Sequence, residues 1–149
     1  MEIVATLVRT VHVLVAALWL GAMTYSLLVI QPRLRTLTGA DPQRLEEAQR
    51  VLAQGNRWPV AALITALWAS GLALLIVPGA AASIGWVVAV KVGLLAGASV
   101  LFWWVSWRGW PRRVFAHPEE LPALQRRFGR VAVAMATLVG IAFVLAVVA

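Results

Sequence analysis

The sequence contains no cysteine and only six acidic residues among its 149 positions. Without cysteine there are no disulfides, no thiolate metal sites and no cysteine-ligated iron–sulfur clusters, although this says nothing about compartment. No acidic residue lies well inside a long apolar stretch, which argues against a carboxylate proton relay or cation transporter. No Ser-His-Asp set can form within the apolar stretches and no phosphate-binding loop is present. Hydrolase and nucleotide chemistries are therefore excluded.

Charged residues of either sign are scarce, at 13% of the chain against 62% hydrophobic residues. This balance excludes an ordinary soluble fold. The net charge of +7 would suggest nucleic acid in a soluble protein. Here the arginines are concentrated in two segments between apolar stretches, where they set membrane topology, so we expect no nucleic-acid partner.

Four apolar stretches are long enough to cross a lipid bilayer, which takes about 20 residues as a helix. They show no apolar–polar alternation of the kind found in membrane strands. Because the lipid core offers no water, every backbone polar group must pair within its own segment. The sequence therefore predicts an all-α integral membrane four-helix bundle in contact with the lipid bilayer, with the first helix ending at Pro32. The predicted spans are residues 3–30, 58–77, 86–107 and 131–149.

Both arginine-rich segments, residues 31–57 and 108–130, follow an odd-numbered span, whereas the turn at 78–85 carries no charge. Basic segments stay on the cytoplasmic side of membrane proteins. The sequence thus predicts a bacterial inner-membrane protein with both segments cytoplasmic and both termini outside.

A short amphipathic helix is predicted within the first basic segment. Asp41 is a suitable N-cap, and Pro42 suits the first helical position. Glu46 and Arg50 are four positions apart, a spacing that pairs side chains on a helix. We expect this helix at the cytoplasmic membrane surface, with one apolar face formed by Leu45, Ala48 and Leu52.

His12 is the most informative residue, because an ionisable ring is costly inside a membrane and usually faces the protein interior or a water-filled cavity. At 100° per residue, Arg9, His12, Trp19 and Met23 fall on one stripe of the first helix. Lys91, the only lysine, lies about a turn and a half inside the third span. The other histidine, His117, precedes Pro-Glu-Glu and is predicted to be a surface or capping residue.

Two cationic groups and one imidazole without a carboxylate suggest an anionic guest, and heme b fits this chemistry. His12 would supply one axial nitrogen, while Lys91 and Arg9 would face the propionates. Trp19 would line the same stripe. Met23 is three turns below His12, about 16 Å along the helix, so both cannot ligate one iron.

Two alternatives remain open. Copper is the rival guest, since Cu(I) favours imidazole and thioether ligands, here His12 and Met23. In the other alternative the membrane histidine only bonds a neighbouring helix, and the protein is a ligand-free structural or assembly subunit.

A GxxxG pattern formed by Gly93 and Gly97 lies on the opposite side of the third helix from Lys91. Small residues at this spacing let membrane helices approach closely. This face is predicted to pack inside the bundle or to form a homodimer.

Three short runs resemble a known group of small membrane proteins. The run His12…Trp19-Leu20-Gly21…Pro32-Arg33 resembles the first helix of HemJ-type protoporphyrinogen oxidases and of CopD copper-resistance domains. The segment from Gly85 to Lys91 is similar to a CopD segment, and Phe128-Gly129-Arg130 before the last helix is also similar. The HemJ resemblance implies heme b bound through a histidine on an early helix, with a lysine on a later one, positions that His12 and Lys91 match. The CopD resemblance implies copper passing into the cytoplasm.

Overall fold

The computed structural model describes residues 2–39, 41–77 and 85–148, and every secondary-structure element in these ranges is helical. This confirms the predicted all-α class. Four helices are long and apolar enough to cross a membrane. They are Glu2–Leu37, Arg57–Ile76, Gly85–Val114 and Pro118–Val148. Most of the uncharged turn predicted at 78–85 lies outside the described residues, as does residue 149 of the last predicted span.

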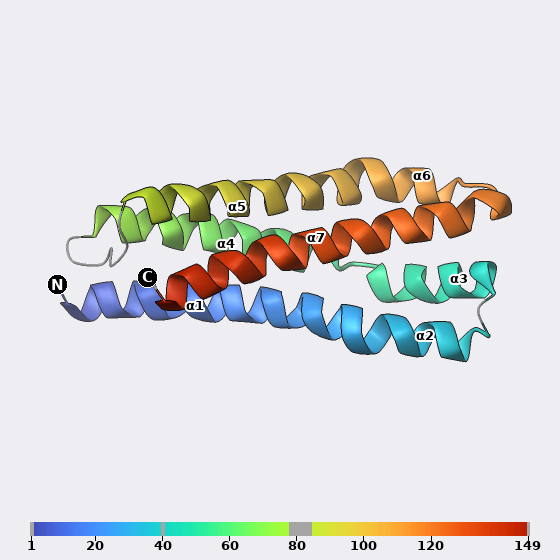
Figure 1. The fold of residues 1–149 in the computed structure, drawn as a ribbon, viewed down its shortest axis with the longest axis horizontal. Coiled ribbons are helices and arrows are strands. Elements are labelled where there is room, and N and C mark those ends of the chain that lie inside the picture. The colour runs from blue at the N-terminus through green and yellow to red at the C-terminus, as the bar shows by residue number, and fades with distance from the viewer. Residues whose placement is uncertain (1, 40, 78–84, 149) are drawn as a thin grey trace.

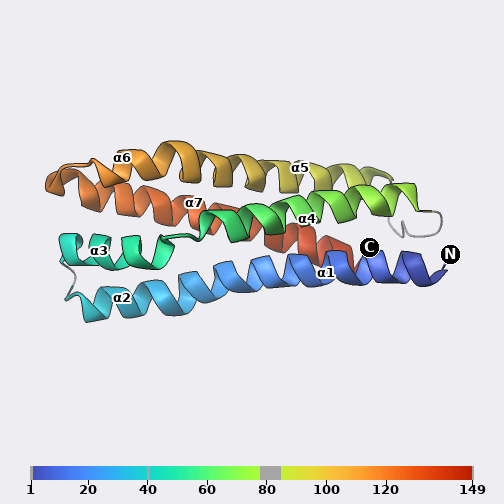
Figure 2. The ribbon, with the colours of Figure 1, turned by 180° about the vertical axis from the view of Figure 1, so that it is seen from behind.

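The helices form an elongated bundle with both termini at one end and α2, α3 and α6 at the other (Figures 1 and 2). In this bundle α1 packs along α4 and α7, and α5 packs along α7. The elements in chain order are α1 (Glu2–Tyr25), η1 (Ser26–Ile30), α2 (Gln31–Leu37), α3 (Pro42–Ala53), α4 (Arg57–Ile76), α5 (Gly85–Trp103), η2 (Trp104–Gly109), α6 (Trp110–Val114), η3 (Pro118–Glu120) and α7 (Leu121–Val148).

A small core of buried side chains holds the four long helices together. Trp19 is 1% exposed and is the largest fully buried side chain among the described residues. Each long helix contributes to the cluster around it, which consists of Trp19, Ile64, Leu67, Ala98 and Val139. An indole fills much of the space between four helices and removes a large apolar area from the surroundings. Trp19 therefore sets the spacing of the bundle at its centre.

The first helix continues past Pro32 to Leu37, so the prediction that Pro32 ends it is wrong. Proline lacks an N–H and its ring clashes with the carbonyl four residues earlier. Here the turn before it widens into the π-helix η1, in which the Gln31 N–H donates to the carbonyl of Ser26, five residues back. The wider turn accommodates the proline, and the chain returns to α-helix in α2.

The third helix uses the same arrangement before Pro111 and runs to Val114 rather than to the predicted residue 107. In η2 the Trp110 N–H donates to the Val105 carbonyl. The Ser106 carbonyl then has no backbone donor, because Trp110 is engaged and Pro111 has no N–H. The guanidinium of Arg57 donates to this carbonyl at 2.5 Å and lies over the Trp107 ring, 5.0 Å from its centroid. Arg57, predicted only as a topology signal, thus satisfies the backbone of a neighbouring helix.

The last helix begins at Leu121, so residues 121–130, predicted as part of a polar loop, are helical. In this segment Arg126, Arg127 and Arg130 are exposed and Leu121 is buried, so the segment is an amphipathic helix. Its many charged residues made it look like a loop in the sequence. His117 precedes the 3₁₀ turn η3, and its backbone N–H donates to the Glu120 carboxylate at 3.1 Å. The prediction of an exposed capping position is confirmed.

The predicted amphipathic helix is confirmed as α3. The Asp41 side chain accepts from the backbone N–H of Gln43 and Arg44. α3 packs against α2 and α7. Leu45 is buried in this contact, but Leu52 is 54% exposed, so the predicted apolar face is narrower than expected.

A buried ion pair, which the sequence did not indicate, joins α3 to α6. Glu46 and Arg113 meet with N–O distances of 2.7 Å, and the side chain of each is 5% exposed. Glu46 also accepts from Arg50 at 3.4 Å, which confirms the predicted i,i+4 pair. Arg113 further donates to Gln49 and lies over the Phe128 ring at 4.9 Å. This network fastens the two halves of the chain together at the arginine-rich end.

The two glycines of the GxxxG pattern have different surroundings. A side-chain Cβ at Gly97 would lie 3.4 Å from Leu138 of α7, whereas one at Gly93 would meet nothing within 4 Å. Gly97 thus supports packing inside the bundle. The homodimer through Gly93 and Gly97 stays a prediction. Of these two glycines, Gly93 has free space beside its Cα.

Two glycines in helices should respond oppositely to alanine. A Cβ at Gly109 would lie 2.9 Å from the Phe128 ring and 3.3 Å from Trp104, whereas one at Gly129 meets open space. Gly129→Ala is expected to stabilise the protein by up to about 1 kcal/mol through helix propensity. Gly109→Ala is expected to destabilise it by about 1–3 kcal/mol through overpacking. Thermal unfolding in detergent followed by circular dichroism checks the pair, and a higher melting temperature for Gly109→Ala would contradict the packing argument.

Candidate functional site

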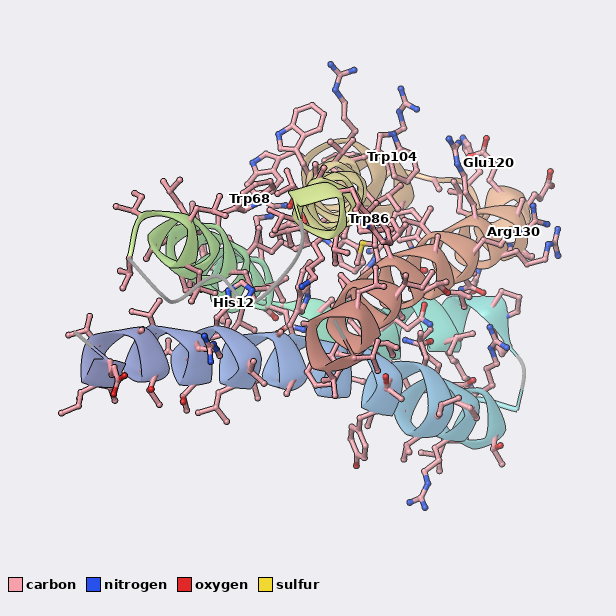
Figure 3. All side chains as sticks on the ribbon, turned by 60° about the vertical axis from the view of Figure 1, so that its left-hand side comes forward. His12, Trp68, Trp86, Trp104, Glu120 and Arg130 are labelled. Atoms are coloured by element: carbon pink, nitrogen blue, oxygen red, sulfur yellow. The ribbon has the colours of Figure 1, made fainter. Side chains whose placement is uncertain are left out.

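His12 lies on α1, is half-buried, and contacts α4 (Figure 3). Its Nδ1 is 2.7 Å from the Ser70 hydroxyl oxygen. Ser70 in turn donates to the Ala66 carbonyl at 2.6 Å. Since a serine hydroxyl has a single proton, we assign the hydrogen of the imidazole to Nδ1, which donates to Ser70. The lone pair of the neutral ring is then on Nε2, the nitrogen that remains for a ligand.

The turn of α4 beside the His12 ring contains a glycine, Gly71. A Cβ at Gly71 would lie 3.4 Å from His12 Cε1. Ser70 therefore binds the imidazole, and Gly71 leaves the room that the ring occupies. Fixing the orientation of a histidine through its second nitrogen is the arrangement common around metal-bound histidines.

A cavity of about 260 Å³ opens beside His12, between α1, α4, α5 and α7. Its polar lining includes Arg9, His12 and Lys91, and none of the described residues that line it is acidic. The rest of the wall is almost entirely apolar. It is formed by Val13, Ala16, Leu67, Trp68, Gly71, Leu72, Leu74, Leu75, Val88, Val92, Leu95, Val139, Ala142, Phe143 and Ala146.

The structure brings together three of the five residues predicted for the site. Arg9 and His12 share a face of α1, and Lys91 reaches the same cavity from α5. A short apolar cavity that concentrates positive charge favours a guest with an apolar body and anionic groups.

Trp19 and Met23, the other two residues predicted for the site, do not line this cavity. Trp19 belongs to the buried core, and Met23 packs against that core. They share the stripe of His12, but at 1.5 Å per residue they lie about 10 and 16 Å further along the helix. Helical periodicity therefore placed them on the same side of α1 as His12, but it did not show how far along the helix the cavity extends.

Ser70 and Trp68 are site residues that the sequence analysis missed. Ser70 lies in a predicted apolar span, where a hydroxyl is itself a signal for an interhelical hydrogen bond. Trp68 lines the cavity and donates from its indole nitrogen to Ser99 of α5 at 3.2 Å. In Figure 3 it lies between α4 and α5.

A second depression, of about 310 Å³, lies at the arginine-rich end of the bundle. It is lined by Gln43, Glu46, Glu47, Arg50 and Leu121. Glu46 and Arg50 are paired with one another, and Glu46 is also engaged by Arg113. These charges stabilise the packing of α3, so the His12 cavity is the better candidate site.

Comparisons of the chain with protein-family models, curated proteins and solved structures give no match. The resemblance to CopD and HemJ-type proteins stays a prediction that depends on the short runs around His12, Lys91 and Phe128. The functional argument therefore depends on the geometry of the cavity.

Proposed function

We propose that the protein is an integral membrane four-helix bundle that binds heme b through His12, with a redox or heme-handling role. The observation that carries this proposal is that a tautomerically assigned imidazole and two cationic side chains line one apolar cavity. Neutral imidazole is a common axial ligand of heme iron.

The membrane part of the proposal follows from four long apolar helices and the distribution of charge. The two arginine-rich segments lie at one end of the bundle, and both termini lie at the other (Figure 1). By the positive-inside rule the arginine-rich end is cytoplasmic and the termini are extracytoplasmic in a bacterial inner membrane. The cavity then lies in the outer half of the bilayer.

The residues of the cavity fit heme in three respects. Ser70 holds the His12 ring so that Nε2 keeps its lone pair for iron. Arg9 and Lys91 provide positive charge for the propionates. The remaining wall is apolar, like the surface of a porphyrin. When bound, heme would supply one-electron redox chemistry, while the protein residues bind it, orient it and exclude water.

The volume of the cavity limits how a porphyrin can bind. At about 260 Å³ it is smaller than the ~300–1,000 Å³ of typical pockets for organic ligands. A porphyrin is therefore not fully enclosed without movement of the helices.

Copper binding is less well supported by the same geometry. The described residues include no group of three or more histidine, cysteine or acidic side chains placed to hold a metal. Met23, the predicted thioether ligand, is not a cavity residue. His12 offers copper one nitrogen beside two cationic groups, and Cu(I) sites use several soft or imidazole ligands.

The visible spectrum of the purified protein tests the proposal. We expect a Soret band and about one heme per chain after expression with adequate heme supply. Colourless protein that carries one copper per chain would support the copper alternative. Colourless, metal-free protein that does not bind added heme, and that co-purifies with another membrane complex, would point to a structural or assembly subunit.

Removing the group that orients His12 should weaken heme binding without abolishing it. Ser70→Ala deletes the acceptor of the Nδ1 hydrogen bond, and loss of such a partner typically lowers metal affinity about 10–100-fold. Heme titration of the apoprotein measures the change. Thr65→Ala, on an exposed turn of the same helix, removes a comparable hydroxyl that bonds only the Ala61 carbonyl. Equal affinities for the two variants would contradict the orienting role of Ser70.

A further inference from the structure

The His12 cavity extends along the seam between α4 and α5. On α4 the lining residues Trp68, Leu72 and Leu75 follow helical spacing and occupy one face. On α5 the residues at Val88, Val92 and Leu95 do the same. The two faces are therefore opposed across this seam.

The close packing of the bundle lies elsewhere. α4 packs on α1, and α5 packs on α7, so each helix of the seam has its principal partner on the side away from the other. Beyond the buried core around Trp19, α4 and α5 can therefore separate along the seam while each keeps its packing on α1 or α7.

Among the described residues, two side-chain hydrogen bonds connect α4 with the third helix. At the arginine-rich end, Arg57 donates to the Ser106 carbonyl. At the edge of the cavity, Trp68 donates to Ser99. From this second bond the cavity extends toward the end of the bundle that holds the termini.

The seam residues are exposed on the outside of the bundle while they line the cavity. Leu72 is 59% exposed, Val92 is 42% exposed and Trp68 is 37% exposed. In a membrane this outer surface faces lipid tails. The same side chains that line the cavity would then also touch the hydrocarbon region at the side of the protein.

We infer that the α4–α5 seam is a lateral passage through which a planar, apolar ligand with acidic groups moves between the bilayer and the His12 cavity. Trp68 and its bond to Ser99 form the latch of this passage. The identity of the ligand as heme rests on the proposed function, whereas the passage itself rests on the seam. A ligand that projects into the seam can also be larger than the cavity, because its apolar edge then lies among exposed seam residues such as Leu72 and Val92.

Heme transfer from liposomes into the apoprotein tests the latch. Ser99 does not line the cavity, so Ser99→Ala removes the latch bond and leaves the binding surface intact. We expect uptake and release to accelerate together by about three- to tenfold, the effect of one hydrogen bond, with the equilibrium affinity unchanged. Trp68→Phe should accelerate uptake by a similar factor, and the double variant should take up heme no faster than the faster single variant.

Two matched variants control this measurement. Thr65→Ala loses the same kind of intrahelical hydroxyl bond as Ser99 but no bond across the seam. Trp58→Phe makes the same substitution as Trp68→Phe at a position on α4 that is 72% exposed and outside the cavity. Both should transfer heme at the wild-type rate. Wild-type rates for Ser99→Ala and Trp68→Phe would overturn the latch.

A second experiment tests the passage without heme. Because the chain has no cysteine, Ala142→Cys places a single thiol in the cavity wall, and Ala134→Cys places one on the exposed face of the same helix. In liposomes, a maleimide dissolved in the lipid should label both thiols, and Ser99→Ala should accelerate labelling at position 142 alone, by about the same three- to tenfold factor. A thiol at 142 that is labelled only by a charged, membrane-impermeant maleimide, or at a rate indifferent to Ser99→Ala, would overturn the passage.

The two failures are distinguishable. If Ser99→Ala accelerates labelling at position 142 but the protein binds no heme, heme is refuted as the ligand and the passage is retained. Heme binding with transfer and labelling rates indifferent to the latch would retain the proposed function and refute the passage.

Discussion

Replacing His12 by alanine is expected to abolish the Soret band of the purified protein and to lower heme affinity at least 100-fold. The iron–nitrogen bond is lost, and no other described residue lining the cavity carries an imidazole, thiolate or thioether group. The substitution also leaves Ser70 with its own bond to the Ala66 carbonyl, so the helix is not left with an unsatisfied group. The loss should therefore appear as a change in binding with little change in folding.

His117→Ala is the matched control, because it removes the only other histidine from an exposed position between α6 and η3, outside the cavity. Its spectrum should equal that of the wild type. Absorption spectra and pyridine hemochromogen assays on the two variants, with circular dichroism to verify helix content, make the comparison. A full Soret band in His12→Ala would remove the basis of the proposed site.

Replacing Glu46 by alanine is expected to destabilise the protein by about 3–5 kcal/mol, the cost of leaving one member of a buried ion pair without its partner. Both side chains of the Glu46–Arg113 pair are 5% exposed, so solvent cannot compensate the remaining guanidinium. The loss also removes the acceptor that Arg50 and Gln125 share. Unfolding in mild detergent, followed by circular dichroism, measures the change.

Glu47→Ala is the control for this prediction, since Glu47 is the adjacent carboxylate and is exposed. We expect it to change stability by no more than about 0.5 kcal/mol. A double-mutant cycle with Arg113→Ala isolates the pair, and the double variant should be less destabilised than the sum of the single variants. Additive effects would show that the two side chains contribute independently and that the bundle end is held by other contacts.

The two helices that pass through proline show how a local rule can fail for a physical reason. Pro32 and Pro111 are each preceded by a residue whose N–H bonds five residues back, so the helix widens before the ring and continues. The residues next to each proline do not predict this wider turn. At Pro111 it depends on Arg57, which lies on another helix and satisfies the carbonyl that the widening leaves without a donor.

At the candidate site, the sequence indicated which side of a helix a residue faces but not which residues it contacts. The helical repeat predicted Arg9 and His12 on one side of α1, and both line one cavity together with Lys91 of α5. The same repeat also included Trp19 and Met23 in the predicted site. Periodicity gives the side of a helix on which a residue lies, but only the neighbouring helices decide how far along it a cavity extends. Ser70 is a hydroxyl residue in an apolar span, but its bond to His12 spans 58 positions of sequence.

By itself the sequence determined the helical class, the four long apolar helices, the N-caps at Asp41 and His117 and the side of α1 that carries the imidazole. These properties follow from backbone hydrogen bonding, apolar composition and a fixed rotation per residue, all of which act within a segment. Only the tertiary structure decided which helices meet, where the cavity lies and how Glu46 finds Arg113. These features depend on the rotation and depth of each helix against its neighbours, which side-chain packing sets across distant parts of the chain.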